Sequence, residues 1–442
     1  MEDEDSPIRV VAKAKKYRRS KRSTPSAGVS RDCKGNRASP RKHVEKLVRA
    51  SAGPRAPPAQ DTVTERQSVV RLGSDCAGYG SDYLALKLNG VKVETSFCAE
   101  IDPQKVALLH RVHDWYNDTD FLLYRDIKDR DNTAAPRCDV FITGAPCQAY
   151  STAGRGAGLD DGKNRGVTIF YSLDYVRCKR PKVVVCENVR GLTFKKHQHI
   201  LNDIIGVMKQ LGYLTKLRVL NTRHHGIPQS RPRLYIVGIR EDTCAHTFHW
   251  PKPVPECPGL LLRFLNTDNR CSKSSINDLN TTMLANVLFW RREEERSDGV
   301  DFLKSTSSST TTYVLDAHAG NDFRHIMLDC SPCLTRARAQ SGGHFVTALR
   351  RMMTVQEIGR LQGCPTSVTN ALRGSHVTDD GIGAAFGDAM SINVLMRVLP
   401  RALYAAGLLR ELPIDMWARQ PPAQGLLPDV MYNRGQDVGD PL

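Results

Sequence analysis

Three short segments of the chain contain residues that could do chemistry. The first, residues 144–148, follows an apolar run and has Cys147 near its end. A thiol becomes a strong nucleophile once it loses its proton, and the preceding Pro146 restricts the backbone that would aim it. The second, residues 187–189, begins with a glutamate after a run of valines, and the third, residues 229–233, has the pattern Gln-x-Arg-x-Arg. Together they supply a nucleophile, a carboxyl group and two guanidinium groups that stay charged.

In this order, each beside a strand-like run, the three segments resemble the catalytic motifs of the cytosine-C5 DNA methyltransferases. The resemblance covers roughly residues 68–245 and 330–410. It implies that Cys147 adds to C6 of a cytosine, which makes the ring electron-rich enough to be methylated at C5. It also implies that Glu187 hydrogen-bonds N3, for which partial burial would have to raise its pKa. Arg233 would reach O2 and brace Glu187, and Arg231 would face the backbone or the catalytic loop.

The same resemblance implies S-adenosylmethionine as the methyl donor. Gly78 and Gly80 would form the turn beneath it, Glu100 would hold its ribose hydroxyls and Asp126 would contact its adenine amino group. The full set expected at the cofactor is Gly78, Tyr79, Gly80, Glu100, Ile101, Asp126, Ile127, Pro146 and Asp388. The set expected at the substrate is Gln148, Ser151, Asn188 and Gln229, beside the catalytic Cys147, Glu187, Arg231 and Arg233.

Three positions depart from the pattern of the family. Cys76 stands where a phenylalanine usually packs against adenine, which predicts weaker cofactor stacking. Asp388 stands where asparagine is usual in the last motif, so a charge is expected beside the catalytic loop. Tyr150 replaces a phenylalanine, which is a mild change.

The loop after the cysteine, residues 149–163, interleaves glycines with Arg155 and Lys163. A methyltransferase of this kind must rotate its target base out of the duplex. The loop is therefore predicted to be a mobile basic lid that closes over the flipped cytosine, with a plain surface loop as the alternative.

The elements that must position these residues follow from hydrophobic patterning. Strands are expected at 69–72, 95–99, 139–143, 182–186, 214–220 and 234–239, and helices near 83–88, 104–112, 198–211, 350–361 and 391–403. Alternating strands and helices predict an α/β fold with a doubly wound, mostly parallel sheet. The expected organisation is a disordered basic tail (1–66), a catalytic core (67–245), a target-recognition region (246–345), the rest of the core (346–412) and a tail (413–442).

The net charge of +16 indicates an anionic partner. Residues 1–66 hold 17 Lys/Arg against 8 Asp/Glu and few large apolar side chains, which is typical of a disordered tail. A dense cluster in it comprises Lys13, Lys15, Lys16, Arg18, Arg19, Lys21 and Arg22. It favours nuclear import or contact with DNA phosphates, and a merely solvated tail is the alternative.

Other classes are disfavoured by composition. No apolar run approaches the roughly 18 residues of a membrane span, and the first residues lack the order of a secretory signal. The 13 cysteines then indicate reduced thiols in the cytosol or nucleus. A zinc site remains an open alternative, built from Cys244, His246, His249 and Cys257, or from Cys330 and Cys333, but no metal is expected.

The expected substrate is therefore duplex DNA, methylated by a monomeric nuclear enzyme. Two rivals remain open. One is an enzyme of the same fold that acts on transfer RNA, although the Cys-Phe-Thr signature of that branch is absent from the sequence. The other is a catalytically inactive DNA-binding regulator, supported by Cys76 and Asp388 alone.

Overall fold

The computed structural model describes residues 40–52, 69–151, 156–255, 257, 259–266, 279–297, 312–320 and 325–418. The basic cluster between residues 13 and 22 lies outside these ranges, as does Arg155 of the predicted lid. The interpretation of that cluster as a nuclear-import or phosphate-binding segment therefore stays a prediction.

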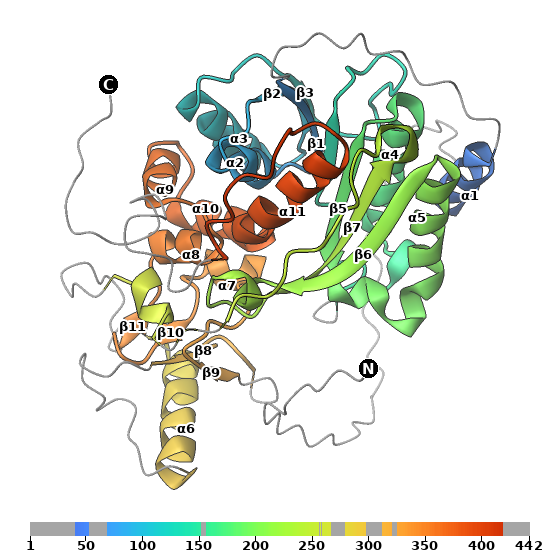
Figure 1. The fold of residues 1–442 in the computed structure, drawn as a ribbon. Helices are drawn as coiled ribbons and strands as arrows, with labels where there is room; N and C mark the ends of the chain where they lie inside the picture. Colours follow the sequence, from blue (N-terminus) through green and yellow to red (C-terminus); the bar gives the residue numbers. More distant parts are fainter. Residues whose placement is uncertain are drawn as a thin grey trace, which may run out of the picture. The chain divides into compact units, whose positions relative to one another are not determined.

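Within the described ranges, seven strands form one sheet in the order β3-β2-β1-β4-β5-β7-β6 (Figure 1). Neighbours run parallel from β3 to β5, while β7 is antiparallel to both β5 and β6. This confirms the predicted α/β class with a mostly parallel sheet. The strands are β1 (Val70–Asp75), β2 (Val93–Ala99), β3 (Leu122–Tyr124), β4 (Val140–Thr143), β5 (Val183–Val189), β6 (Tyr213–Asn221) and β7 (Pro232–Arg240).

Strand β5 shows why the centre of the sheet is so apolar. Its consecutive valines alternate between two separate cores: Val183 and Val185 pack on one face, and Val184 and Cys186 on the other. A strand that helices cover on both faces has no polar side, which explains the unbroken apolar run. The strand continues beyond its predicted end at residue 186 because β7 pairs with it as far as Val189.

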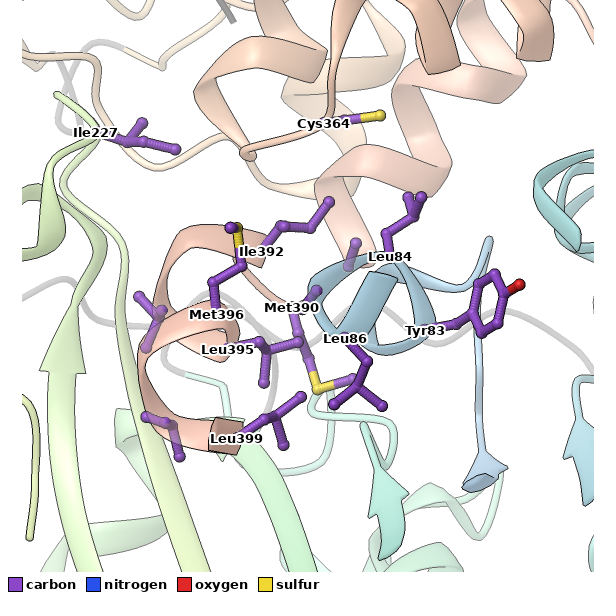
Figure 2. Close-up of a cluster of buried hydrophobic side chains, with 14 of the residues drawn as sticks. Tyr83, Leu84, Leu86, Ile227, Cys364, Met390, Ile392, Leu395, Met396 and Leu399 are labelled. Atoms are coloured by element: carbon purple, nitrogen blue, oxygen red, sulfur yellow. The ribbon is translucent and has the colours of Figure 1, made fainter. Parts of the chain in front are cut away.

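Helices cover both faces of this sheet (Figure 1). On one face lie α2 (Ser81–Leu88), α3 (Pro103–Trp115) and α11 (Ile392–Ala405). On the other lie α1 (Pro40–Ser51), α4 (Thr168–Lys179) and α5 (Gln198–Gln210). In the first core Leu86 of α2 and Leu395 and Leu399 of α11 gather around Met390 (Figure 2). Met390, which precedes α11, is thus packed against α2, near the beginning of the catalytic core in sequence.

A second, smaller sheet has the order β11-β10-β8-β9. Its strands are β8 (Tyr313–Leu315), β9 (Ile326–Leu328), β10 (Phe345–Val346) and β11 (Arg351–Met352), and α6 (Thr281–Ser297) packs on it through Met283 and Val287. The remaining helices are α7 (Arg336–Gln340), α8 (Val355–Leu361), α9 (Thr366–Arg373) and α10 (Asp379–Asp388). The small sheet and α6 begin in the predicted recognition region (246–345). The last residue of β10 and all of β11 lie beyond the expected end of that region at residue 345.

Two predicted tail segments are ordered where they meet the core, and both predictions need correction. Residues 40–51, expected to be disordered, form α1 because Val44 and Leu47, one turn apart, are buried against α4 and α5. After residue 412, expected to be a tail, Trp417 is 2% exposed in the first core and Asp415 pairs with Arg397. In both places tertiary burial orders a segment whose composition resembles a tail.

Among the described residues, no single helix is long and apolar enough to cross a membrane, although α10 and α11, which meet at a bend of 43°, satisfy that test as a pair.

Candidate active site

Cys147 lies in a short loop after β4, at the edge where the parallel strands end. The Asn188 side-chain amide donates to the Ala145 carbonyl at 3.2 Å, which ties the loop to the end of β5. The Cys147 carbonyl accepts the backbone N–H groups of Tyr150 and Ser151 at 2.9 and 3.0 Å. These bonds form a tight turn that fixes the direction of the partly exposed thiol.

The chain after β5 also buttresses this turn. Gly191 passes so close to the Tyr150 carbonyl that a Cβ atom would collide with it. The Tyr150 hydroxyl donates to the Gly166 carbonyl, and its ring meets His197 edge-on. The extra hydroxyl, relative to the phenylalanine usual in the family, therefore anchors the loop that follows Cys147.

Strand pairing explains why Glu187 and Arg233 meet. Glu187 of β5 lies opposite Tyr235 of β7, so Arg233, two residues along, is its diagonal neighbour on the same face. The Arg233 Nε atom lies 3.4 Å from Glu187 Oε1, and both side chains are mostly buried. The predicted bracing of Glu187 by Arg233 is present in the structure.

Burial and neighbouring charges shift the pKa values of both Glu187 and Cys147. Burial raises the pKa of the Glu187 carboxyl, although Arg233 and Arg231 oppose the shift. Burial also raises the pKa of the Cys147 thiol, while Arg233 lowers it and Glu187 raises it further. The thiol is therefore mainly protonated at neutral pH and depends on Arg233 for stabilisation of its thiolate.

Arg231, predicted to be catalytic, is only 2% exposed. Its guanidinium donates to the carbonyls of Leu334, Gly387 and Ala389 at 2.8, 3.0 and 2.6 Å. These bonds tie β7 to the segment before α7 and to the end of α10. The Arg231 side chain therefore holds neighbouring segments of the site together by donating to their backbone carbonyls. Contact with the backbone was one of the two positions predicted for it.

The four residues predicted to bind substrate differ in position. Gln229 is fully buried, and its side chain donates to the Leu361 carbonyl and accepts the Leu334 N–H, so it supports the site from inside. Asn188 is also buried, with its amide on Ala145. For these two the predicted substrate contact must be corrected, because their polar atoms are already used by the backbone. Gln148 and Ser151 are partly exposed beside Cys147.

The predicted cofactor residues come together because β3, β2, β1 and β4 are adjacent and end at one edge. Glu100, after β2, accepts the N–H groups of Gly78 and Asp102, each at 2.9 Å. Gly78 has a φ of +61°, which favours glycine, and a Cβ there would meet open space. Asp126, after β3, and Pro146, after β4, lie at the same edge.

The side chains at this edge fit a nucleoside. Ile101 next to Glu100 is 66% exposed, so an apolar surface stands beside an acid that could hold ribose hydroxyls. Tyr79 and Ile127 must be corrected: both side chains are buried, and Tyr79 packs edge-on against Phe386. Only their backbones could reach a cofactor. Cys76 has a φ of +55° and leaves the usual aromatic position without a ring.

Asp388 does not bring an uncompensated charge to the site. Its carboxylate accepts Lys105 of α3 at 2.6 Å and Arg336 of α7 at 2.8 Å. Arg336 also lies 3.6 Å from Asp102. The negative charge of Asp388 is therefore balanced by two cations from distant segments of the chain, Lys105 and Arg336.

One neighbour of the site had no predicted catalytic role. Cys333 lies against the guanidinium groups of both Arg231 and Arg233. The only sequence signal was its Cys-x-x-Cys spacing, which suggested zinc. Within the described ranges, no group of three or more His, Cys, Asp or Glu is placed to hold a metal ion.

Comparison with known families agrees with this geometry. The model of the family "C-5 cytosine-specific DNA methylase" matches residues 71–402. This chain belongs to the C-5 cytosine-specific DNA methylase family.

The chain is similar to bacterial and phage members of this family. It is 35% identical to the orphan methyltransferase M.SPRI of Bacillus phage SPR over 173 residues, which is 39% of this chain and 38% of that protein. It is 27% identical to the type II methyltransferase M.HhaI of Haemophilus parahaemolyticus over 280 residues, 62% of this chain and 78% of that protein. The chain thus spans less than half the length of M.SPRI.

A solved structure shares the fold of the methylase. The crystal structure of the S. pombe Dnmt2 methyltransferase superposes with a TM-score of 0.51 at 16% identity, covering 76% of this chain and 99% of that one. At that identity the likeness concerns the fold alone.

Buried charged side chains on and beside α8 bind the segment that ends at residue 266. Thr354 and Glu357 form a capping box at the start of α8, and Glu357 also accepts Arg351 and the Asn266 N–H. Arg360 donates to the Phe264 carbonyl and to the Asn266 side chain. The inserted segment is thereby held against the core by a satisfied polar network.

Proposed function

We propose that this methylase is a DNA (cytosine-5-)-methyltransferase that uses S-adenosylmethionine and a covalent adduct of Cys147. The observation that carries the proposal is the convergence of Cys147, Glu187 and Arg233 at the sheet edge that also bears Glu100 and Gly78. A nucleophile, a carboxyl group whose pKa is raised by burial and a neighbouring guanidinium thus lie near the residues proposed to hold the cofactor. Family membership supports cytosine C5 as the target.

In the proposed reaction each group has one task. The Cys147 thiolate forms a bond to C6, and the ring electrons move toward N3, where Glu187 donates a hydrogen bond or its proton. Arg233 donates to O2 and keeps Glu187 in place. When bound, S-adenosylmethionine supplies the methyl group that C5 takes up. Loss of the C5 proton and release of the Cys147 sulfur then restore the aromatic ring.

Duplex DNA is the proposed substrate. The net charge of +16 favours a polyanion, and phosphate contacts would supply most of the affinity. The target base must leave the stack to reach Cys147. Tyr150, three residues after Cys147, is held by the hydrogen bond from its hydroxyl to the Gly166 carbonyl. The small sheet and α6 are proposed to contact bases, since base contacts determine sequence preference.

The proposal is tested by trapping on 5-fluorocytosine. The fluorine at C5 cannot leave as a proton, so a competent enzyme with bound S-adenosylmethionine stalls as a covalent complex. We expect a denaturation-resistant band with fluorocytosine duplex DNA and none with fluorocytosine transfer RNA. A band with RNA alone would move the assignment to the RNA branch, and no band with either would favour an inactive DNA-binding protein.

Replacing Glu187 with glutamine should separate catalysis from thiol reactivity. Glutamine cannot donate a proton to N3, so we expect single-turnover methyl transfer to slow by about 10²–10⁴-fold. When it is ionised, the Glu187 carboxylate raises the pKa of Cys147, and glutamine cannot ionise, so the thiol should be alkylated by iodoacetamide at a lower pH than in the wild type. A slower enzyme with a more reactive nucleophile is the expected combination.

The matched control is Glu94→Gln, on the exposed side of β2. It should change neither the rate nor the alkylation profile. Wild-type methyl transfer by Glu187→Gln would remove Glu187 from the proposed mechanism.

A further inference from the structure

Cys333 is brought to the active site by a connection between distant segments. Gln229 and Ser331 form an isolated parallel bridge. The Ser230 N–H donates to the Ser331 carbonyl, and the Ser331 N–H donates to the Pro228 carbonyl, both at 2.8 Å. The chain after this bridge therefore runs beside the start of β7, close to Arg231 and Arg233.

The sulfur of Cys333 accepts hydrogen bonds from both arginines. Arg233 Nη2 lies 3.7 Å from Sγ and Arg231 Nη1 lies 3.8 Å from it. The Arg233 side chain also donates to the Pro232 carbonyl at 2.9 Å and lies 3.4 Å from the Glu187 carboxylate. The sulfur thus helps to fix the guanidinium that braces Glu187.

We propose that Cys333 is a positioning residue for methyl transfer: its sulfur holds Arg233 beside Glu187, and its charge state sets how readily Cys147 loses its proton. The proposal rests on the proposed function for the role of Cys147. It extends that function by coupling the nucleophile to a second thiol through a shared guanidinium.

The charges around the two thiols determine which of them ionises first. Burial would raise the pKa of Cys333, but Arg233 and Arg231 outweigh it and lower the pKa below its ordinary value. The pKa of Cys147 is instead raised, chiefly by burial. Cys333 therefore ionises first, and its negative charge makes the second ionisation, at Cys147, more costly.

The other charged groups facing this cluster do not reverse that order, and Asp388 raises the pKa of Cys147 further. Glu187, on the neighbouring strand, has a raised pKa because it is buried, which favours its neutral form. His344, beside the Cys333 backbone, has a pKa lowered to about 4 by burial, so it is neutral at physiological pH. The two arginines remain the cations that Cys333 and Cys147 share.

Two substitutions at Cys333 should give different pH midpoints for the alkylation of Cys147. Cys333→Ser keeps a hydrogen-bond acceptor but removes the titrating charge, so the pH midpoint for alkylation of Cys147 should fall by about 0.5–1 unit. Cys333→Asp, of similar volume, makes the negative charge permanent, so the midpoint should stay at or above that of the wild type. Cys333→Ser should also shift the pH–rate profile of methyl transfer to lower pH without changing KM for DNA.

The measurement is isotope-coded iodoacetamide labelling of the full-length protein between pH 5 and 10, read at each cysteine by peptide fragmentation. It needs neither DNA nor cofactor, so it remains informative even if the proposed function fails. Cys244→Ser and Cys244→Asp, at an exposed thiol, are matched controls that should leave the Cys147 midpoint unchanged.

A Cys147 midpoint that falls in Cys333→Ser and stays at or above the wild-type value in Cys333→Asp, with thermal unfolding midpoints near that of the wild type, supports the proposal. Equal midpoints in wild type, Cys333→Ser and Cys333→Asp, or a shift in the same direction for both variants, overturns it. If the aspartate variant unfolds early, Cys333→Ser decides alone: a midpoint that does not fall refutes the coupling.

Discussion

Replacing Cys147 with serine is expected to lower the rate of methyl transfer to DNA by at least about 10⁴-fold, the size of effect seen when an enzyme loses its nucleophile. A serine hydroxyl ionises far less readily than a thiol, so little alkoxide forms to attack C6. The rigid turn that carries the residue is held by Asn188 and by backbone bonds from Tyr150 and Ser151, none of which uses the sulfur. Binding of DNA and of S-adenosylmethionine should therefore persist.

The measurement is single-turnover transfer from methyl-labelled cofactor, together with equilibrium binding of each ligand. Cys244→Ser, at an exposed thiol on the core surface, is the control and should behave as wild type. Retained methyl transfer in Cys147→Ser would refute the covalent mechanism, whereas loss of ligand binding would show a folding defect.

Replacing Arg130 with alanine is expected to cost about 3–5 kcal/mol of folding free energy. Arg130 pairs with Asp75 through two bonds of 2.5 and 2.9 Å, and neither side chain is exposed. Its guanidinium also stacks near the rings of Phe97, Tyr124 and Tyr175. Without it, the Asp75 carboxylate at the end of β1 would be a buried charge that, among the described residues, keeps the Ser172 hydroxyl as its side-chain donor.

Denaturant unfolding of the variants measures this effect. Arg373→Ala removes a pair with Asp379 in which both side chains are about half exposed, and it should cost under about 1 kcal/mol. Adding Asp75→Ala to Arg130→Ala should recover part of the loss, because the unpaired charge is then removed. An Arg130→Ala variant as stable as Arg373→Ala would show that the buried pair contributes little.

Much of the fold and the central group of the site could be predicted from the sequence because their signals are local. The unbroken valines before Glu187 encode a strand buried on both faces, and the alternation of strands and helices encodes the parallel sheet. Cys147 follows β4 and Glu187 lies near the end of the parallel strand β5, whereas Arg233 lies near the start of the antiparallel strand β7, so all three meet at one edge. The pairing of Glu187 with Arg233 follows from that arrangement.

Other features of the site depend on contacts between residues far apart in the chain. Asp388 appeared to add an uncompensated charge, but Lys105 and Arg336 neutralise it from two other helices. Gln229 and Asn188 were expected at the substrate, yet the packed backbone takes up their polar atoms.

By itself, the sequence determined which strands are followed by chemically active residues, and which chemical groups those residues supply. Only the tertiary structure decided that residues 40–51 are a docked helix, that Arg231 faces the backbone, and that Cys333 reaches the arginines through the bridge at Ser331. The physical reason is that hydrophobic period and turn residues act between neighbours in sequence. Burial, charge compensation and hydrogen-bond satisfaction are settled by whichever groups the folded chain brings together.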